Sequence, residues 1–403
     1  MSEWNTTTLG GLCSSGGGSI QTGPFGSQLH AEEYSAAGVP VVMPQDIGEN
    51  TIRTAQIARV PESVAERLGR HRLATGDIVF SRRGDVTRRA LVRENNVDWL
   101  CGTGCLRVRP GSAVDSQFLS YLLGTTDARD WLLGNAVVTN MLNLNTTILG
   151  RLPLAVPPLS EQRAIAEVLG ALDDKIAVNT AIAERAEDLA ALTYDSIVAS
   201  WPRVAISSVL DPILGGTPTR AREEYWASGD QLWISARDIT SAPSRVVYDT
   251  AEKITTTAIA GTKAKALPAG SVILTARGTV GEVGRLARSA SFNQSCYGFR
   301  PDTIPPGLLY FAILRATGRA KAVAHGSVFD TITKTTFDHL DLAWDANRAA
   351  AAEGAIAPLL DVVSATIVEN RNLAATRDAL LPQLMSGKLR VHDAEEAASR
   401  AGA

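Results

Sequence analysis

The sequence predicts an α+β protein in which two similar mixed α/β domains are joined by two long helices. Three observations indicate this fold. The chain of 403 residues carries a long internal repeat, each copy contains short β-rich runs that end in turns, and a helical stretch with coiled-coil spacing follows each copy. We expect the two helices to form an antiparallel coiled coil, which gives the molecule a pseudo-two-fold axis. The alternative is two independent amphipathic helices, each docked on its own domain.

Five sequence blocks recur in the same order and define the repeat, with a period near 190 residues. The β-rich blocks GDIVFSRRG and GSVILTARG are one such match. A period this long is typical of a duplicated domain and not of a solenoid. The boundaries are a first domain at 1–158, a helix at 159–200, a second domain at 201–345, a helix at 346–391, and a tail at 392–403 that we expect to be disordered.

Three pairs of polar residues or cysteines match between the copies: Asp46 with Asp238, Arg83 with Arg277, and Cys105 with Cys296. The aspartates precede isoleucine in both copies and are expected to be cap or turn residues. The arginines precede glycine at a strand end, where they could hold a phosphate. The cysteines are expected to be buried thiols.

The two helices show alternating steps of three and four residues between apolar positions. The first helix starts at Ser160, a good N-cap, and a proline at position 358 favours a bend or a late start of the second helix. Asn179 and Asn370 fall on the seams, where a polar residue fixes the register of a coiled coil. The predicted seams are Ile165, Leu169, Leu172, Ile176, Asn179, Ala183, Ala186 and Ala190, and Ile356, Leu360, Val363, Ile367, Asn370, Ala374, Leu381 and Leu384.

The net charge of −3 excludes a polybasic DNA coat, but the charge is unevenly distributed along the chain. Residues 160–201 carry 3 basic and 8 acidic side chains, whereas residues 202–345 carry 16 basic and 13 acidic ones. The acidity therefore lies mainly on the first helix, and the repeated domains are neutral to basic. Phosphate contact by these domains becomes plausible, and the acidic helix is better suited to a protein partner.

Motifs of catalysis are missing from the sequence. It contains no phosphate-binding loop ending in Lys-Ser/Thr, no HExxH, no GxSxG and no Asn-Pro-Pro-aromatic block. Four cysteines without a zinc-like spacing indicate free thiols in a reducing compartment. We expect no signal peptide and no membrane span, and thus a cytoplasmic protein without a metal or cofactor site.

Two stretches then resemble a known family. PLAVPPLSEQRAIAEVLGALDDKI resembles the central conserved region of the specificity subunits of type I restriction-modification systems (the HsdS family), and LAATRDALLPQLMSGKLRV resembles their distal conserved region. GVPVVMPQDI, GDIVFSRRG and GSVILTARG resemble strand blocks of their target recognition domains. The second copy departs from the pattern, because DLAWDANRAAAAEGA stands where the first copy has the PPLSEQ lead.

The resemblance implies a non-catalytic subunit that recognises double-stranded DNA. Each domain would read one half of a bipartite target, and the helices would act as a spacer and dock two copies of the modification methyltransferase subunit (HsdM). That partner would use S-adenosylmethionine, so no cofactor is expected in this chain, and the restriction/translocase subunit (HsdR) would join the complex. The alternative is a two-domain coiled-coil scaffold that binds proteins and not DNA.

Side chains that can bond base edges or phosphates supply the candidate DNA contacts. Arg83 and Arg277, which recur, are expected to serve shared positioning, and the positions that differ between the copies are expected to encode different half-sites. The candidates in the first domain are Gln21, Gln45, Arg82, Arg83, Arg88, Arg89, Asn143 and Asn145. Those in the second are Thr219, Arg220, Arg237, Arg277, Asn293, Gln294, Tyr297 and Lys334.

Overall fold

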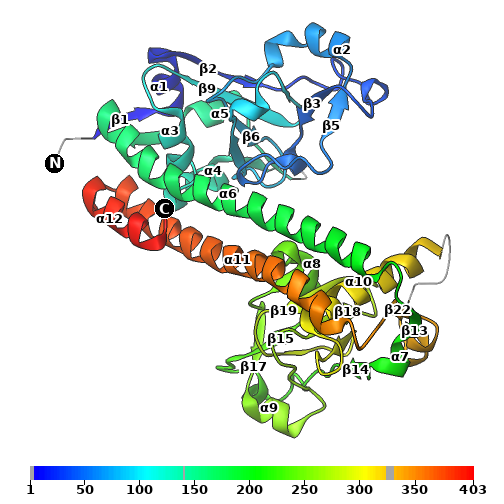
Figure 1. Ribbon diagram of the computed structural model, residues 1–403. Coiled ribbons are helices and arrows are strands. Elements are labelled where there is room, and N and C mark those ends of the chain that lie inside the picture. The colour runs from blue at the N-terminus through cyan, green and yellow to red at the C-terminus, as the bar shows by residue number, and fades with distance from the viewer. Residues whose placement is uncertain (1–3, 139–140, 324–330) are drawn as a thin grey trace. The chain divides into compact units, whose positions relative to one another are not determined.

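The computed structural model describes residues 4–138, 141–323 and 331–403, and the chain divides into two compact units (Figure 1). The first unit comprises residues 1–175 and 372–403, and the second comprises residues 176–371. Each unit therefore contains one mixed α/β domain together with a segment of each long helix. The units are described one at a time.

The first unit is built on one five-stranded sheet and one three-stranded sheet. The central strand of the larger sheet, IVFS, is buried along its whole length, as expected for a β-rich run between two neighbours. The five-stranded order is β2 (Gly17–Thr22), β9 (Cys105–Gly111), β6 (Ile78–Ser81), β7 (Arg89–Leu91), β4 (Glu49–Asn50). The smaller sheet has the order β5 (Ala58–Val60), β3 (Val39–Val42), β8 (Leu100–Cys101), and two-stranded pairs join β1 (Asn5–Thr8) to β12 (Pro153–Val156) and β10 (Val137–Val138) to β11 (Leu142–Asn143).

The second unit repeats the five-stranded sheet, the three-stranded sheet and the pair β1–β12 of the first unit, and among the described residues the pair β10–β11 has no counterpart. Its five-stranded order is β14 (Ile213–Leu214), β21 (Cys296–Phe299), β18 (Val272–Thr275), β19 (Val283–Leu286), β16 (Val246–Val247). Its three-stranded order is β17 (Glu252–Ile254), β15 (Gln231–Ile234), β20 (Ala290–Phe292), and β13 (Arg203–Ala205) pairs with β22 (Asp341–Ala343). The same pairings in the same order confirm the internal repeat and the α+β fold.

Short helices cover the sheets of both units. The first unit contains α1 (Leu9–Ser15), α2 (Glu62–Arg67), α3 (Ser116–Leu122), α4 (Thr126–Asn135) and α5 (Thr146–Gly150), with 3-10 turns η1 (Ala31–Glu33), η2 (Pro44–Asp46), η3 (Gly69–His71) and η4 (Glu94–Asn96). The second contains α7 (Ile206–Val209), α8 (Ala236–Ser241), α9 (Thr256–Gly261) and α10 (Pro306–Val323), with η5 (Glu223–Tyr225), η6 (Pro243–Arg245) and η7 (Lys334–Asp338). The helix α10 is continuous where the first unit has the separate helices α3 and α4.

The long helices are α6 (Leu159–Val198) and α11 (Ala349–Met385). In the second unit Ala183 and Ala186 of α6 pack with Val363 and Ile367 of α11, while Asn179, nearer the start of α6, bonds to Glu369, further along α11. Residue numbers thus rise along one helix as they fall along its neighbour, so these segments pair antiparallel, as predicted.

Three details of these helices differ from the predictions. The buried residues of α11 after Asn370 are Leu373, Leu380, Leu384 and Met385, so the seam continues through Leu373 and does not pass through Ala374 or Leu381. The helix α11 begins at Ala349, nine residues before Pro358, which rules out the late start. The tail is helical and not disordered: α12 (Val391–Ala401) buries Ala394 and Ala398. These alanines are four residues apart, so they lie on one face of α12 that can pack on the domain.

The helix α11 is also long and apolar enough to resemble a membrane span, with a mean hydropathy of 1.5 over 18 residues, of which 28% are buried. Several of its apolar side chains are accounted for by packing, because Ile356, Leu360, Val363 and Ile367 are buried in the second unit. Length and composition alone are therefore weak grounds for placing this helix in a bilayer.

Candidate nucleic-acid interface

In the first unit the turn that follows β6 exposes an arginine. Arg83 is exposed, and Gly84 adopts a φ of +76°, a conformation that favours glycine and closes the turn. Arg83 forms an isolated antiparallel bridge with Asn143, and the Leu144 N–H donates to the Arg82 carbonyl at 2.9 Å. This backbone pairing brings the turn beside the segment 142–145, which is distant in sequence.

The second unit contains the equivalent turn. Arg277 is exposed, Gly278 has a φ of +77°, and the Ile332 N–H donates to the Ala276 carbonyl at 2.9 Å, which matches the bond between Leu144 and Arg82. We name the pairs Arg83–Gly84 and Arg277–Gly278 the arginine turns. Among the described residues, neither arginine side chain has an ion-pair or hydrogen-bond partner. Both cations are thus free to meet an external anion.

The neighbours of the two arginine turns differ. In the first unit the Arg82 guanidinium lies 5.7 Å from the ring of the exposed Phe25, and the exposed Asn145 caps α5 by accepting from the Ile148 N–H at 2.8 Å. In the second unit Ala276 stands in place of Arg82. Its N–H donates to the Ser295 carbonyl, and this bond places the turn 293–295 alongside. The structure thus brings different side chains to equivalent places.

Several predicted residues of the second unit lie near its arginine turn. Gln294 is exposed, and the half-buried Asn293 accepts from the Ser295 N–H at 3.0 Å. Lys334 is exposed in the segment just after Ile332 and forms an ion pair with Asp211 at 3.0 Å. Backbone bonds of Ala276 thus bring the segments that carry these side chains next to the second arginine turn, a proximity that the sequence does not reveal.

Other predicted residues are exposed but are not connected to the arginine turns by a described contact. Gln45 is exposed on η2, and Arg237 and Thr219 are exposed in the second unit. Arg220 stacks 3.6 Å from the Trp226 ring centroid and forms a two-pronged ion pair with Glu252, which holds the pKa of that carboxyl below its usual range. The charge of Arg220 is therefore already neutralised.

Three predicted residues face the interior. Gln21 accepts from Arg107 at 2.7 Å, Arg89 is 4% exposed and donates to the Ser120 carbonyl, and Tyr297 is 6% exposed with its ring edge-on to Phe337. Each lies on a strand, where the side chains alternate between faces, and the inward face cannot be identified without the pairing register. The side chains of Gln21 and Tyr297 are therefore poorly placed to contact a ligand at the surface, whereas Arg89 lines a cavity that is described below.

The remaining matched pairs have structural roles, as expected. Asp46 accepts from the Met43 N–H at 2.8 Å, and Asp238 accepts from the Ser235 N–H at the same distance, so both aspartates close a turn. Cys105 and Cys296 are buried in the cores, and burial raises the pKa of both thiols, that of Cys296 to about 12.

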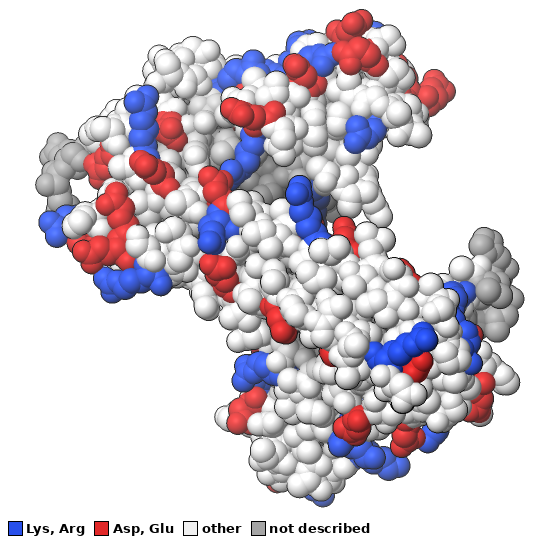
Figure 2. Space-filling model, in the orientation of Figure 1, with Lys and Arg blue, Asp and Glu red and all other residues white. Residues whose placement is uncertain are grey.

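Charge is interspersed on the surface. On the face shown in Figure 2, lysine and arginine side chains alternate with acidic ones, and neither unit presents a continuous basic field. Within residues 4–138, 141–323 and 331–403, no group of three or more histidine, cysteine, aspartate or glutamate side chains is placed to hold a metal ion. The site therefore consists of single exposed cations and amides around a turn.

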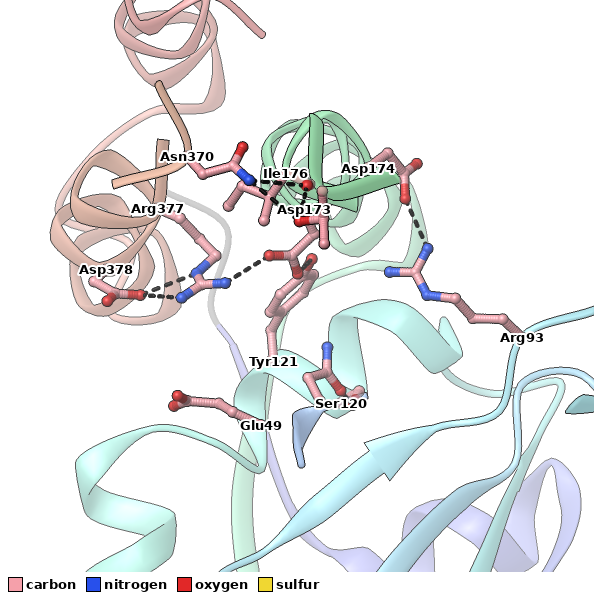
Figure 3. A network of polar contacts seen from close by, with 12 residues as sticks. Glu49, Arg93, Ser120, Tyr121, Asp173, Asp174, Ile176, Asn370, Arg377 and Asp378 are labelled. Atoms are coloured by element: carbon pink, nitrogen blue, oxygen red, sulfur yellow. Dashed lines mark hydrogen bonds and ion pairs between the residues drawn. The ribbon is translucent and has the colours of Figure 1, made fainter. Parts of the chain in front are cut away.

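Sequence reasoning missed a polar network where the helices meet in the first unit (Figure 3). Arg377 of α11 donates to Asp173 of α6 at 2.7 Å, and the Tyr121 hydroxyl of α3 donates to the same carboxylate at 2.6 Å. One residue further along α6, Asp174 accepts from Arg93 at 2.7 Å. Because the seam passes through Leu373, Arg377, four residues later, also lies on it. The sequence contains this spacing, but the predicted seam through Ala374 does not include Arg377.

The register asparagines lie on the seam of the second unit, as predicted. Asn179 is buried and donates to Glu369 at 2.8 Å. Asn370 donates to the Ile176 carbonyl at 3.2 Å (Figure 3). Each amide thus bonds to the opposite helix, and neither bonds to the other asparagine. A slip in register would leave buried polar groups unpaired.

The second copy lacks the PPLSEQ lead of the first copy, but its long helix docks on the domain through a contact of its own. In the first unit Gln162 accepts from the Asp115 N–H at 2.9 Å. In the second unit Glu353 accepts from the N–H groups of Gly307 and Leu308 at 2.8 and 2.9 Å. The two helices therefore dock on their domains through one equivalent contact, made by different residues.

Comparison with known proteins agrees with this architecture. A family model described as the type I restriction modification DNA specificity domain matches residues 1–188 and 200–343. The putative type I restriction enzyme MjaX specificity subunit of Methanocaldococcus jannaschii is 27% identical over 146 residues, which are 34% of each chain. The type I restriction enzyme EcoprrI specificity subunit of Escherichia coli is 30% identical over 88 residues, 22% of this chain and 21% of that protein. These matches span about a third or less of the relatives' length.

Among solved structures, the S subunit of a type I restriction-modification system from M. genitalium has a TM-score of 0.60 at 14% identity and covers 95% of this chain and 96% of that one. At this identity the likeness shows the fold. The family model matches most of the chain and does so in both copies of the repeat. The chain therefore belongs to the family of the type I restriction-modification DNA specificity domain.

Proposed function

We propose that this chain is the DNA-specificity subunit of a type I restriction-modification complex, in which each domain recognises one half of a bipartite target. The observation that carries the proposal is the pair of arginine turns. An exposed cation without an internal partner recurs at the same place in two copies of one fold, while the side chains around it differ. Two related domains that recognise different half-sites would share a phosphate contact and differ in the side chains that contact bases.

The chemistry of the two classes of residue divides the task. Arg83 and Arg277 are suited to backbone phosphates, because phosphate contacts position a protein without reading sequence. Base recognition falls to the exposed amides and cations that differ between the copies, since such groups can bond to base edges in the major groove. We assign these roles to Gln45, Arg82, Asn143, Asn145, Arg237, Asn293, Gln294 and Lys334, and to the hydroxyl of Thr219.

The helices and the partners complete the proposal. The helix pair, with Asn179 and Asn370 fixing its register, would set the spacing of the half-sites and dock two copies of the modification methyltransferase subunit. Methyl transfer from S-adenosylmethionine would take place on that subunit, and the restriction/translocase subunit would join to cleave unmodified DNA. In this proposal the chain itself binds no cofactor, catalyses no reaction and works in the cytoplasm.

Base-resolved mapping of adenine methylation tests the proposal in cells that express the methyltransferase subunit with and without this chain. We expect methylation at one split, asymmetric motif only when the chain is present. Methylation without preference for a split target would refute the proposal.

Binding of the reconstituted complex to that motif then tests the arginine turns. Arg83→Ala and Arg277→Ala should each weaken binding to all sequences alike and lower the slope of log K against log salt by about 1. Lys388→Ala, an exposed position without a described side-chain contact, is the control. If both variants bound DNA with the affinity of the wild type, the arginine turns would not be part of the DNA interface.

A further inference from the structure

A polar cavity of about 240 Å³ lies in the first unit, at the hairpin that carries the first arginine turn. Its lining includes Glu49, Arg53, Asp85, Arg88, Arg89 and Arg129. Four arginines and two acidic residues thus line the cavity. The described contacts of the first unit do not balance this charge.

Two of the arginines have carboxylate partners and two do not. Arg129 pairs with Glu49 at 3.0 Å, and Arg88 pairs with Asp85 at 3.3 Å. Among the described residues, Arg89 and Arg53 have no carboxylate within ion-pair distance. The cavity therefore holds a surplus of about two positive charges.

The surplus is costly because it is partly buried. Arg89 is 4% exposed, and its one described hydrogen bond goes from Nε to the Ser120 carbonyl. The Nε atom of Arg129 is buried without an acceptor. Burial, together with the nearby charge of Arg129, lowers the pKa of Arg89 to about 10. The two carboxylates that act on Arg89, Glu49 and Asp173, are already paired with Arg129 and Arg377. A buried cation without a carboxylate of its own is unfavourable unless an anion is supplied from outside.

The second unit shows how the same position is neutralised from within. The hairpin-closing bond from Ser81 N–H to the Arg88 carbonyl corresponds to that from Thr275 N–H to the Glu282 carbonyl, so Arg88 and Glu282 are equivalent. Glu282 accepts from Arg245 at 3.0 Å and from Lys321 at 2.8 Å. The second copy thus has a built-in carboxylate where the first copy has a further cation.

We propose that the cavity of the first unit binds a phosphate group, and that the second unit has no such site. A guanidinium group can donate two parallel hydrogen bonds to the oxygens of one phosphate. The cavity is large enough for one phosphate with water. The phosphate could belong to the DNA backbone, in which case the inference rests on the proposed function, or to a free anion. Binding of inorganic phosphate is independent of DNA and so tests the site by itself.

Thermal unfolding of the full chain in rising inorganic phosphate, with chloride at the same ionic strength as reference, measures this binding. We expect the melting temperature to rise and saturate with phosphate but not with chloride, because a ligand that binds the folded state stabilises it. Arg88→Glu, which copies the second unit, and Arg53→Gln should each raise the apparent Kd for phosphate by about tenfold or more. Lys388→Glu, an equal charge reversal in the same unit, should leave it unchanged.

A duplex oligonucleotide carrying the target identifies the source of the phosphate. Competition between the duplex and inorganic phosphate would assign the cavity to the DNA backbone, and simultaneous binding would assign it to a free anion. An identical response to phosphate and chloride, or wild-type phosphate affinity in both Arg88→Glu and Arg53→Gln, would overturn the proposal. Neither of those results would affect the methylation test, so the two failures are distinguishable.

Discussion

The ion pair between Arg377 and Asp173 should contribute far more to the stability of the first unit than the neighbouring pair between Arg93 and Asp174. The two pairs have the same 2.7 Å separation, and their aspartates are adjacent on α6. They differ in burial: the side chains of Arg377 and Asp173 are 20% and 13% exposed, whereas those of Arg93 and Asp174 are 39% and 63% exposed. The inner pair also has further partners, since Arg377 pairs with Asp378 at 2.8 Å and Asp173 accepts from Tyr121. The comparison therefore measures the effect of burial together with these additional bonds.

The magnitude follows from what each substitution leaves behind. Removing one partner of a fully buried pair costs about 3–5 kcal/mol. Asp173 keeps the hydroxyl bond from Tyr121 and some contact with water, so we expect Arg377→Met to cost about 2–3 kcal/mol. The exposed pair is screened by solvent, and Arg93→Met should cost about 0.2–1 kcal/mol.

Two double-mutant cycles measure the difference. One combines Arg377→Met with Asp173→Asn, and the other combines Arg93→Met with Asp174→Asn. Urea unfolding followed by hydrogen exchange of peptides from the first unit separates its transition from that of the second unit. A coupling energy for the Arg377 cycle no larger than that of the Arg93 cycle would refute the reasoning.

Three further outcomes are expected. Burial, with Arg70 nearby, lowers the pKa of His71 to about 4, below its unfolded value of about 6.5, so stability is complete above pH 6.5 and falls as the pH drops towards 4. His71→Gln should reduce the fall of the urea unfolding midpoint between pH 6.5 and pH 4. The same fall in the variant and the wild type would contradict this prediction. Glu353→Ala should cost the second unit about 1–3 kcal/mol by unpairing two N–H groups of α10, with Glu353→Gln milder in the same hydrogen-exchange assay. Asp77→Asn should cost the first unit about 2–4 kcal/mol, because Asp77 is buried with two bonds from Arg109, and a loss below 0.5 kcal/mol would refute this.

The paired helices show how far pattern reading reaches. Steps of three and four predicted the seam through Ile367 and placed Asn179 and Asn370 on it, because helical geometry repeats regularly. The prediction failed after Asn370, where an alanine was chosen over Leu373. Leu373 and Ala374 are three and four residues after Asn370, so the spacing permits either on the seam. Only the packing in the folded protein shows that Leu373 is the buried one.

The candidate site shows the complementary limit. Arg83 and Arg277 were found because they recur before glycine at a strand end, which is a local signal. Arg89 and Tyr297 were chosen for their chemistry and proved to be buried, since the face that a strand residue occupies depends on its partners. Phe25, exposed beside Arg82, was missed because their proximity joins segments 57 residues apart.

The sequence by itself determined the duplication, the α+β class, the two helices and their polar seam residues. These features are encoded in short-range periodicity and in repeated blocks, which a linear chain displays directly. The tertiary structure alone decided which charges are neutralised. Arg88 and Glu282 occupy equivalent positions in the matching hairpins of the two units. Arg88 lines a cavity with surplus positive charge, whereas Glu282 accepts bonds from two cations. Charge balance depends on neighbours brought together by folding, because electrostatic interactions act through space and not along the chain.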